Sequence, residues 1–250
     1  MHGLTPRGMA PFLLILFLFG AVSMDALDHL AASAAQASGE LSQPLYAPPK
    51  KFTPRARVGG DMRGTDGTDP EMTVLVPDHV GYTVKDTPAL NWFLSKPTSH
   101  EVRFTLRDDR SPRAFQEKAI PTPKQPGIYT INLKELGLVL EPNVQYRWFV
   151  SIILDNDSHS KNIVAGGMIE RCELSDCLVE FDARLPCTEQ NVIENARQGL
   201  WYDAMGCLCH LIDEKPSDAQ LRRLRARLLK DVGLNGVAEW DLRSIQSPLR

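Results

Sequence analysis

The sequence lacks both a large excess of charge and an apolar run long enough to cross a membrane. Its 250 residues include 28 basic and 31 acidic side chains, which gives a formal net charge of −3. With an isoelectric point near 6.1, this balance gives no reason to expect nucleic acid or an anionic membrane as a partner. The apolar run at residues 11–22 is too short to span a bilayer as a helix.

The N-terminal residues instead have the pattern of a secretory signal peptide. Arg7 precedes the apolar run without any acidic residue beside it, and Ala35 and Ala37 supply the small residues that a cleavage site needs. We therefore expect a signal peptide at residues 1–37 and an exported protein, periplasmic or on the cell surface. Cleavage after Ser23 and a retained N-terminal anchor stay open as alternatives.

Catalytic, metal-binding and phosphate-binding motifs are also missing. The glycine-rich stretch at 59–64 lacks the Gly-Lys-Ser/Thr of a phosphate loop, so a flexible turn is expected. The stretch 155–159 begins like a calcium loop, but Ser160 and Gly166 stand where a glycine and an acid are required. We therefore predict no catalytic, cofactor-binding or metal-binding residue, no cofactor and no enzymatic activity.

Five cysteines stand at positions 172, 177, 187, 207 and 209, and their spacing matches no tetrahedral zinc pattern. In an exported protein they can oxidise. Cys172, Cys177 and Cys187 lie in a loop-like stretch where two of them can meet, so we predict a disulfide among these three. Cys207 and Cys209 project from different sides of one helix and cannot bond each other.

Residues 38–71 are rich in proline, glycine and basic side chains and show no apolar period. A segment of this composition has no repeating face with which to build a core. We interpret it as a flexible linker that is mobile or lies extended on the surface.

Between residues 72 and 171, apolar residues recur with the period of two that is typical of β-strands. The clearest case is the stretch 144–154, in which every second residue is apolar, so we predict a central strand with one buried face. Turn residues such as Pro77-Asp78 and Pro142-Asn143 separate about seven such short strands. Strands at this spacing predict a two-layer antiparallel β-sandwich.

The order of three motifs within this region is similar to that of an immunoglobulin or fibronectin type III sandwich. These motifs are Pro88-x-x-x-Trp92, the strand EVRFTLRD and Tyr146-Arg147-Trp148. We expect Trp92 and Trp148 to face each other across the core, where two indole rings would supply a large share of the stability.

After a connection at 172–187, the apolar residues recur with the helical period of 3.6. Thr188 predicts the start of a first helix and Gly199 its end, Pro216 ends a second helix, and Ser217 predicts the cap of a third. The motif Gly199-x-Trp201-x-x-Ala204 resembles half of a tetratricopeptide repeat. Its glycine and alanine recur 34 residues later, one repeat length, in what we expect to be a truncated successor. We predict a tetratricopeptide-like helical segment at 188–250.

Three short helices bury too little apolar surface to fold alone. We therefore predict that Leu200, Trp201 or Leu208 packs on the sandwich or on the connection that follows it. The sandwich and the helices would then unfold as one cooperative unit.

The helical segment also contains the residues that we predict to contact a partner. Arg223, Arg227 and Lys230 share the helix face opposite the leucines, which is either a solvated face or a binding patch. Together with Trp201 and Tyr202, they form the candidate partner-binding set.

Several short motifs are distributed along nearly the whole of the portion that we expect to be exported. They are Leu75-Val-Pro77, Gly81-x-Thr83, Pro88-x-x-x-Trp92, YRWFVSII, GGMIER and GLWYDAM, with Arg-x-Gly-Gly-x-x-Arg-Gly upstream. Taken together, they resemble the bacterial domain-of-unknown-function family DUF928. The resemblance implies a secreted or envelope-associated bacterial protein, and it brings no activity, ligand or catalytic residue.

Two functions from different classes stay open. The first is a non-catalytic protein–protein interaction module of the cell envelope, whose partner is another envelope protein. The alternative is a protein that binds an envelope polymer or carbohydrate, with Tyr82, Phe93 or Tyr129 as sugar platforms, and a hydrolase ranks third. For all of them we expect no nucleic acid and no membrane contact beyond the signal segment.

Overall fold

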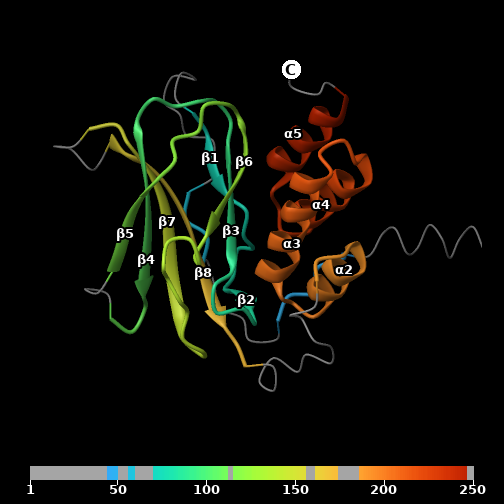
Figure 1. The fold of residues 1–250 in the computed structure, drawn as a ribbon, viewed down its shortest axis with the longest axis horizontal. Helices are drawn as coiled ribbons and strands as arrows, with labels where there is room; N and C mark the ends of the chain where they lie inside the picture. The colour runs from blue at the N-terminus through green and yellow to red at the C-terminus, as the bar shows by residue number, and fades with distance from the viewer. Residues whose placement is uncertain are drawn as a thin grey trace, which may run out of the picture. The chain divides into compact units, whose positions relative to one another are not determined.

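Strand β7 (Gln145–Ile153) lies inside the larger of two β-sheets in the computed structural model of the chain. The structure describes residues 44–49, 56–59, 70–111, 115–155, 161–173 and 186–246, so the predicted signal peptide lies outside it. The described part combines two sheets, mostly antiparallel, with four helices (Figure 1). No helix in this part is both long enough and apolar enough for a membrane span.

The larger sheet has five strands in the order β2-β8-β7-β4-β5. Besides β7 they are β2 (Gly81–Thr83), β4 (Glu101–Asp108), β5 (Phe115–Ile120) and β8 (Ile163–Arg171). Every second side chain of β7 is buried, and those between are half-buried. Because β4 and β8 pair with β7 from its two sides, the prediction of a central strand at 144–154 is confirmed.

Two strands of this sheet differ from what the sequence predicted. β2 pairs with β8 in parallel, with Gly81 opposite Ile169, so the prediction of a purely antiparallel sandwich is wrong at this edge. β5 stands at the other edge of the sheet and is exposed along nearly its whole length. Its sequence FQEKAI shows no alternation of apolar and polar residues, because neither of its faces is buried.

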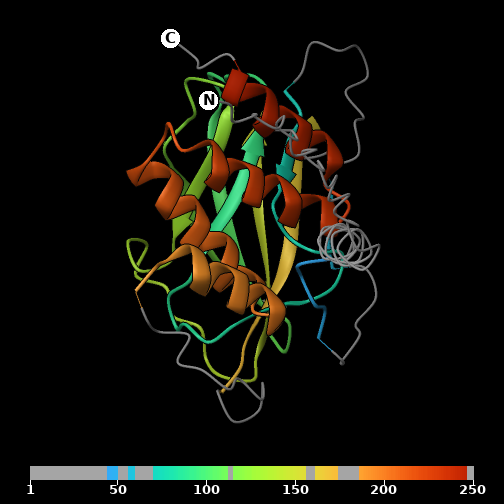
Figure 2. The same ribbon diagram turned by 90° about the vertical axis from the view of Figure 1, so that its right-hand side faces the viewer.

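The smaller sheet has three strands in the order β1-β3-β6 and lies between the larger sheet and the helices (Figures 1 and 2). Its strands are β1 (Met72–Val74), β3 (Ala89–Leu94) and β6 (Gly127–Asn132). β3 is buried on both of its faces. Trp92 contacts Tyr129 of the neighbouring strand, and the adjacent Phe93 contacts Trp240 of the helical segment. Trp92 and Trp148 are both fully buried in one shared core.

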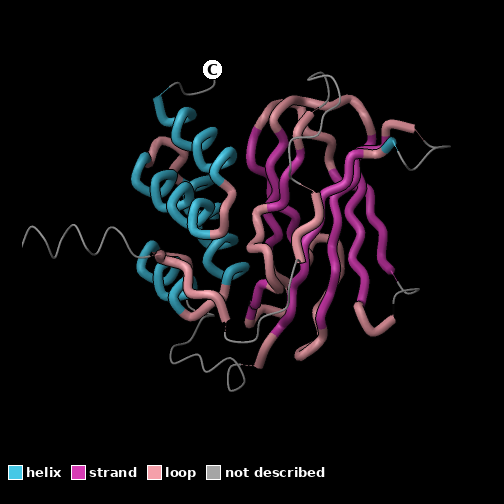
Figure 3. Tube along the Cα trace, turned by 180° about the vertical axis from the view of Figure 1, so that it is seen from behind, coloured by secondary structure: helices cyan, strands magenta, loops and turns pink. Residues whose placement is uncertain are grey.

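The four described helices are α2 (Glu189–Arg197), α3 (Trp201–Glu214), α4 (Ala219–Asp231) and α5 (Asn235–Gln246). Thr188 caps α2 by accepting the N–H of Asn191, and Gly199 follows the helix with a φ of +77°, so both predicted ends are confirmed. The predicted cap at Ser217 is wrong. Asp218 takes that place and accepts the N–H groups of Gln220 and Leu221. α5 lies where the sequence predicted only a truncated repeat, and Figure 3 shows the α-helices gathered on one side of the sheets.

Part of the predicted flexible linker is built into the core, and that interpretation is corrected. Leu45 and Tyr46 are only 7% and 4% exposed. Their backbone N–H groups donate to the carboxylate of Asp231, near the end of α4, at 2.7 and 3.0 Å. Ala47 donates its N–H to the carbonyl of Ala196 in α2. Residues 44–49 therefore tie two helices together, and single anchoring contacts of this kind leave no periodic pattern in a sequence.

A second piece of the same segment, residues 56–59, extends the larger sheet. Val58 pairs with Gly166 of β8 through two backbone hydrogen bonds of 2.8 Å. The guanidinium group of Arg57 donates to the carbonyls of Val76 and Val232, which belong to the strand layer and to the end of α4. The chain from Pro44 onward consequently forms one compact unit, rather than a sandwich and a separate helical domain.

Candidate functional site

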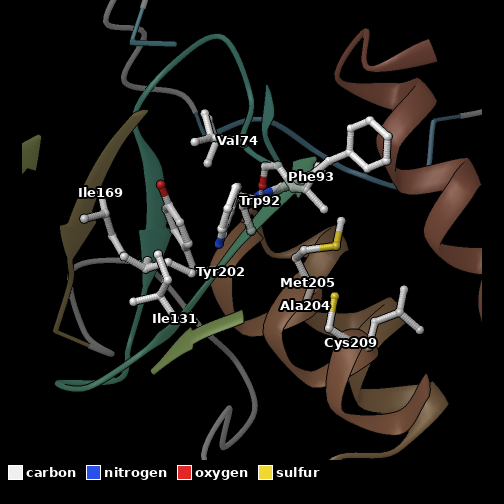
Figure 4. Packing of buried hydrophobic residues seen from close by; sticks show 14 of the residues in the cluster. Val74, Trp92, Phe93, Ile131, Ile169, Tyr202, Ala204, Met205 and Cys209 are labelled. Atoms are coloured by element: carbon white, nitrogen blue, oxygen red, sulfur yellow. Dashed lines mark hydrogen bonds between the residues drawn. The ribbon is translucent and has the colours of Figure 1, made fainter. Parts of the chain in front are cut away.

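Trp201 and Tyr202 open helix α3 and lie at the seam between the helices and the strands. They are 0% and 2% exposed, and Figure 4 shows Tyr202 projecting among buried strand residues such as Trp92 and Ile169. The indole N–H of Trp201 donates to the carbonyl of Leu75 at 2.7 Å. This contact confirms the prediction that Trp201 packs on the strand region. It also corrects the prediction that these two side chains contact a partner, because no partner can reach them.

The hydroxyl group of Tyr202 joins three parts of the core. It donates to the carbonyl of Met168 in β8 at 3.0 Å and accepts the indole N–H of Trp148 in β7 at 2.8 Å. Gly81 of β2 gives the ring its space, since a Cβ atom at Gly81 would lie 2.7 Å from the Tyr202 ring. Burial raises the pKa of this hydroxyl, so it stays a neutral donor and acceptor. Its role is structural.

Asp203, the next residue of α3, is a carboxyl group buried at 0% exposure. One oxygen, Oδ2, accepts the N–H of Val84 at 3.1 Å, whereas Oδ1 has no partner among the described residues. Burial raises its pKa to about 6, although Lys85 and a hydrogen bond from Thr83 act in the opposite direction. The carboxyl links α3 to the turn after β2, and ionising it in this apolar place is costly.

The basic residues predicted on the third helix lie on α4. Arg223 and Lys230 are exposed, and Arg227 is half-buried and has an interaction of its own. The neighbouring Arg225 faces inward and donates two hydrogen bonds of 2.7 Å to the buried Asp241 of α5. The sequence therefore placed the outward face of α4 correctly, and whether that face binds a partner stays a prediction.

A pair of arginines on the larger sheet was not found from the sequence. Arg107 of β4 and Arg147 of β7 stand directly opposite each other. Both alternate with buried residues such as Leu106 and Trp148, so they lie on the face of the sheet opposite the core. Like charges in this position repel. The buried Nε of Arg107 has no hydrogen-bond partner among the described residues. Such a buried, unpaired donor needs an explanation, because native structures contain few of them.

The neighbours of this pair show how unusual Arg107 is. Arg147 donates to Asp109 at 2.8 Å, and the other arginine of β4, Arg103, binds two carboxylates. Phe115 of β5 is the other cross-strand neighbour of Arg107 and is 56% exposed. We call Phe115, Arg107 and Arg147 the arginine patch. It joins two guanidinium groups to an exposed aromatic ring, which suits a carboxylate with an apolar neighbour.

The other end of this face is closed. Met168 of β8 stands opposite Arg147 in the sheet and is 5% exposed. It packs with Ala56 and Val80 in a small separate cluster. The arginine patch is therefore bounded on this side by the segment 56–59.

The aromatic residues considered as sugar platforms are mostly unavailable. Tyr82 is 9% exposed and Phe93 is 5% exposed, with its ring against Trp240. Tyr129 is more exposed, but its hydroxyl donates to the carbonyl of Gln125 and its ring contacts Trp92. All three are less exposed than Phe115.

The cysteines divide into different environments. Cys172 is disulfide-bonded, Cys187 has a free thiol, and Cys177 lies outside the described residues. Cys207 and Cys209 are also free, and the thiol of Cys209 accepts a hydrogen bond from Arg225 at 3.5 Å. In the described part of the chain no three histidine, cysteine or acidic side chains gather as a metal site would require. Most of the stretch considered as a calcium loop, residues 156–160, lies outside that part.

Comparison with known proteins gives one family. The sequence profile of the family described as Domain of Unknown Function (DUF928) matches residues 58–242, which include both sheets and the helices. No curated protein matches. A crystal structure of a multi-domain immunophilin from Arabidopsis thaliana is 9% identical, with 80% of this chain and 100% of that chain covered and a TM-score of 0.18. A similarity of that size supports no conclusion about fold or function.

Proposed function

The chain belongs to the DUF928 family, and from this premise we propose that it is an exported, non-catalytic binding module of the bacterial cell envelope. Its partner is another envelope protein, which docks an acidic segment on the arginine patch. Export is supported by the N-terminal sequence, in which Arg7 and a short apolar run precede small residues.

The observation that carries the proposal is Arg107, whose Nε has no hydrogen-bond partner among the described residues and which stands opposite Arg147. A planar guanidinium binds a carboxylate through two parallel hydrogen bonds. A partner carboxylate that binds the terminal nitrogens of these guanidinium groups would reduce the repulsion between the two arginines. Arginine and aromatic residues are also the types that dominate binding energy in protein interfaces.

The exposed ring of Phe115 and the edge strand β5 favour a protein over a polymer as the partner. Phe115 offers an apolar contact beside the charges. As an edge strand, β5 presents unpaired backbone groups that an extended segment can join by strand addition. A carbohydrate polymer has no peptide backbone with which to add a strand at that edge.

At a finer level, we propose an immunoglobulin-like strand arrangement and a tetratricopeptide-like pairing of helices. The support for the second is that neighbours in the chain pack together, α2 with α3 and α4 with α5. In this arrangement the helices pack against the smaller sheet and support it. The outer face of the larger sheet binds the partner protein.

The test is site-specific photo-cross-linking in envelope fractions. A photoreactive residue replaces Phe115 in one variant and Val139 in a control, because Val139 is also exposed, at 62%, and lies outside the arginine patch. We expect an adduct only from position 115, and its mass map should identify an acidic segment of one protein. Adding Arg107→Glu should weaken the adduct about tenfold or more. Adding Arg223→Glu, which makes the same charge change on α4, should leave it intact.

Other results would overturn the proposal in identifiable ways. Equal adducts from positions 115 and 139 would mean unspecific contact. Loss of the adduct with Arg223→Glu alone would move the site to α4. Sedimentation with purified peptidoglycan that depends on Arg107 would favour the envelope-polymer alternative.

A further inference from the structure

Within the described part of the chain, strand β5 has a neighbouring strand on one side only. It pairs antiparallel with β4 and ends the strand order of the larger sheet, as Figure 1 shows. Its residues are exposed from Phe115 to Ala119, and Ile120 is half-buried. The backbone groups on the free side of β5 are therefore open to an added strand.

The register of β4 and β5 assigns the side chains of β5 to the two faces of the sheet. Lys118 stands opposite Phe104, which is fully buried in the core. Lys118 and, two residues later, Ile120 therefore project on the core-facing side, where Ile120 packs against the core and Lys118 stays exposed. Phe115 projects on the outer face, beside Arg107.

Two cations at this end of the sheet lack a carboxylate. Arg103 of β4 binds both Glu101 and Glu117, whereas no ion pair joins Lys118 or Arg107 to any residue that the structure describes. A lysine on the core-facing side of an edge strand opposes pairing with most strands. It favours a neighbouring strand that places an acid beside it. Lys118 therefore makes this edge selective.

We propose that the acidic segment of the partner adds to β5 as a sixth, antiparallel strand of the larger sheet. An apolar residue of the segment lies opposite Ile120, one acid lies opposite Lys118, and a second acid lies opposite Phe115. Numbered from the apolar residue, the acids stand at the third and sixth positions. This inference rests on the proposed binding function and specifies the sequence that docks there.

Each position follows from the register. The apolar residue covers Ile120, and the first acid pairs with Lys118 across the strands. The second acid lies two strand spacings from Arg107, about 10 Å, and the long side chains of a glutamate and an arginine can meet beside the Phe115 ring. An acid at the fourth position would lie opposite Glu117 and be repelled. The antiparallel direction is favoured because its hydrogen bonds are the more stable.

A second copy of this chain fits the edge less well. When two copies of β5 pair antiparallel about a two-fold axis, side chains on the same face stand opposite each other. The two registers centred on the strand place Glu117 opposite Glu117, or Lys118 opposite Lys118, and like charges in these positions repel. The edge therefore favours a different protein.

The experiment measures the binding of fluorescein-labelled ten-residue peptides to the full chain by fluorescence anisotropy. The probe TTITETTETT has the required spacing, and the control TTITTEETTT has the same composition but places its acids opposite Glu117 and Gln116. We expect the control to bind about fivefold more weakly or worse. Lys118→Glu should weaken the probe about fivefold, and the peptide TTITKTTETT should restore binding to that variant because the charges are exchanged.

Methylation of the peptide backbone tests the added strand directly. Only alternate N–H groups of an added strand point towards its neighbour. A probe methylated on the nitrogens of its fourth and sixth residues should therefore differ strongly from one methylated at the fifth and seventh. One should lose binding and the other should bind nearly as well as the parent. Equal effects of the two patterns would overturn strand addition.

Two further results would overturn the inference, namely equal binding of probe and control, or no binding of the probe at millimolar concentration. The proposed function would survive either result if the adduct from position 115 in envelope fractions still depends on Arg107, so the two failures are distinguishable. Arg223→Glu on α4 is the control variant and should leave probe binding unchanged. Lys118 is exposed, so Lys118→Glu should keep the circular dichroism spectrum of the wild type.

Discussion

Polar groups on the two faces of the five-stranded sheet differ in their hydrogen bonding. On the inner face, Tyr202 pairs its hydroxyl with a donor from β7 and an acceptor from β8. On the outer face, Arg107 stands beside another arginine with its Nε unpaired among the described residues. The Tyr202 hydroxyl therefore has both a donor and an acceptor and serves the fold. We propose that the arginines of the outer face are available for binding.

Removing the Trp201 side chain should cause the largest loss of stability among the substitutions on the inner face. Trp201→Ala deletes a fully buried ring and leaves the Leu75 carbonyl without its donor. We expect a loss of about 3–5 kcal/mol in the free energy of unfolding, measured by urea titration. Trp240→Ala is the control, because that ring is only partly buried against Phe93 and should cost less. Equal losses, or two separate transitions in the wild type, would contradict a cooperative seam.

The buried carboxyl of Asp203 should make the inner side sensitive to pH. Its pKa of about 6 in the folded chain lies above the usual 3.8, so the folded state binds the proton more tightly. Stability from this group is therefore full below about pH 4 and is lost as the pH rises through 6. A rise of about 2 in pKa corresponds to about 3 kcal/mol.

The comparison with Asp203→Asn isolates this effect. Glu101 and Asp108 have lowered pKa values through hydrogen bonds with Arg103 and Arg110, so they contribute the opposite trend in both proteins. The difference in unfolding free energy between wild type and variant should change across pH 4–7 in favour of the variant at higher pH. A difference that stays constant over this range would exclude Asp203 as its source.

A methyl group at Gly81 should destabilise the protein by crowding the inner face of the sheet, without changing the outer face. In Gly81→Ala the new Cβ would lie 2.7 Å from the Tyr202 ring, so the ring or β2 must shift. We expect a loss of about 1–3 kcal/mol, measured by thermal or urea unfolding. Gly236→Ala in α5 meets no atom within 4 Å and should be neutral. A neutral Gly81→Ala would show that the seam is loosely packed.

The smallest change in the free energy of unfolding is expected for a substitution on the outer face. The sign of this change is the informative result. Arg107→Met removes the unpaired Nε and the repulsion by Arg147, so stability should stay unchanged or rise by up to about 1 kcal/mol. Arg103→Met on the same strand breaks two ion pairs and should give no change or a slight loss. A clear loss with Arg107→Met would mean that Arg107 serves the fold rather than a partner.

How far the sequence predicts this fold depends on whether an element has one buried face. The stretch 144–154 and the first three helices have such a face, so their periodicity revealed them. β5 has none, and β2 is too short to show a period. Tyr46 lies in a proline-rich segment without a period and contacts His79, Trp201 and Asp231, which are distant in the sequence, so a single sequence gives no signal of these contacts.

The candidate sites depend on register and packing, which a single sequence does not contain. Arg107 and Arg147 lie 40 positions apart and meet only because β4 and β7 align in one of several registers. Asp203 is different, because an acid within the apolar stretch WYDAM was a visible signal of a buried carboxyl.

The hydrogen bonds from Leu45 and Tyr46 to Asp231 also constrain when this chain can fold. The partners are 186 and 185 positions apart, so the N-terminal segment cannot be fixed before α4 has been synthesised. Contacts this distant slow folding, because a long loop must close before they contribute. For a protein that is exported as we propose, this delay would be useful. A chain that cannot finish folding before its last helices are synthesised stays unfolded and can be translocated across a membrane.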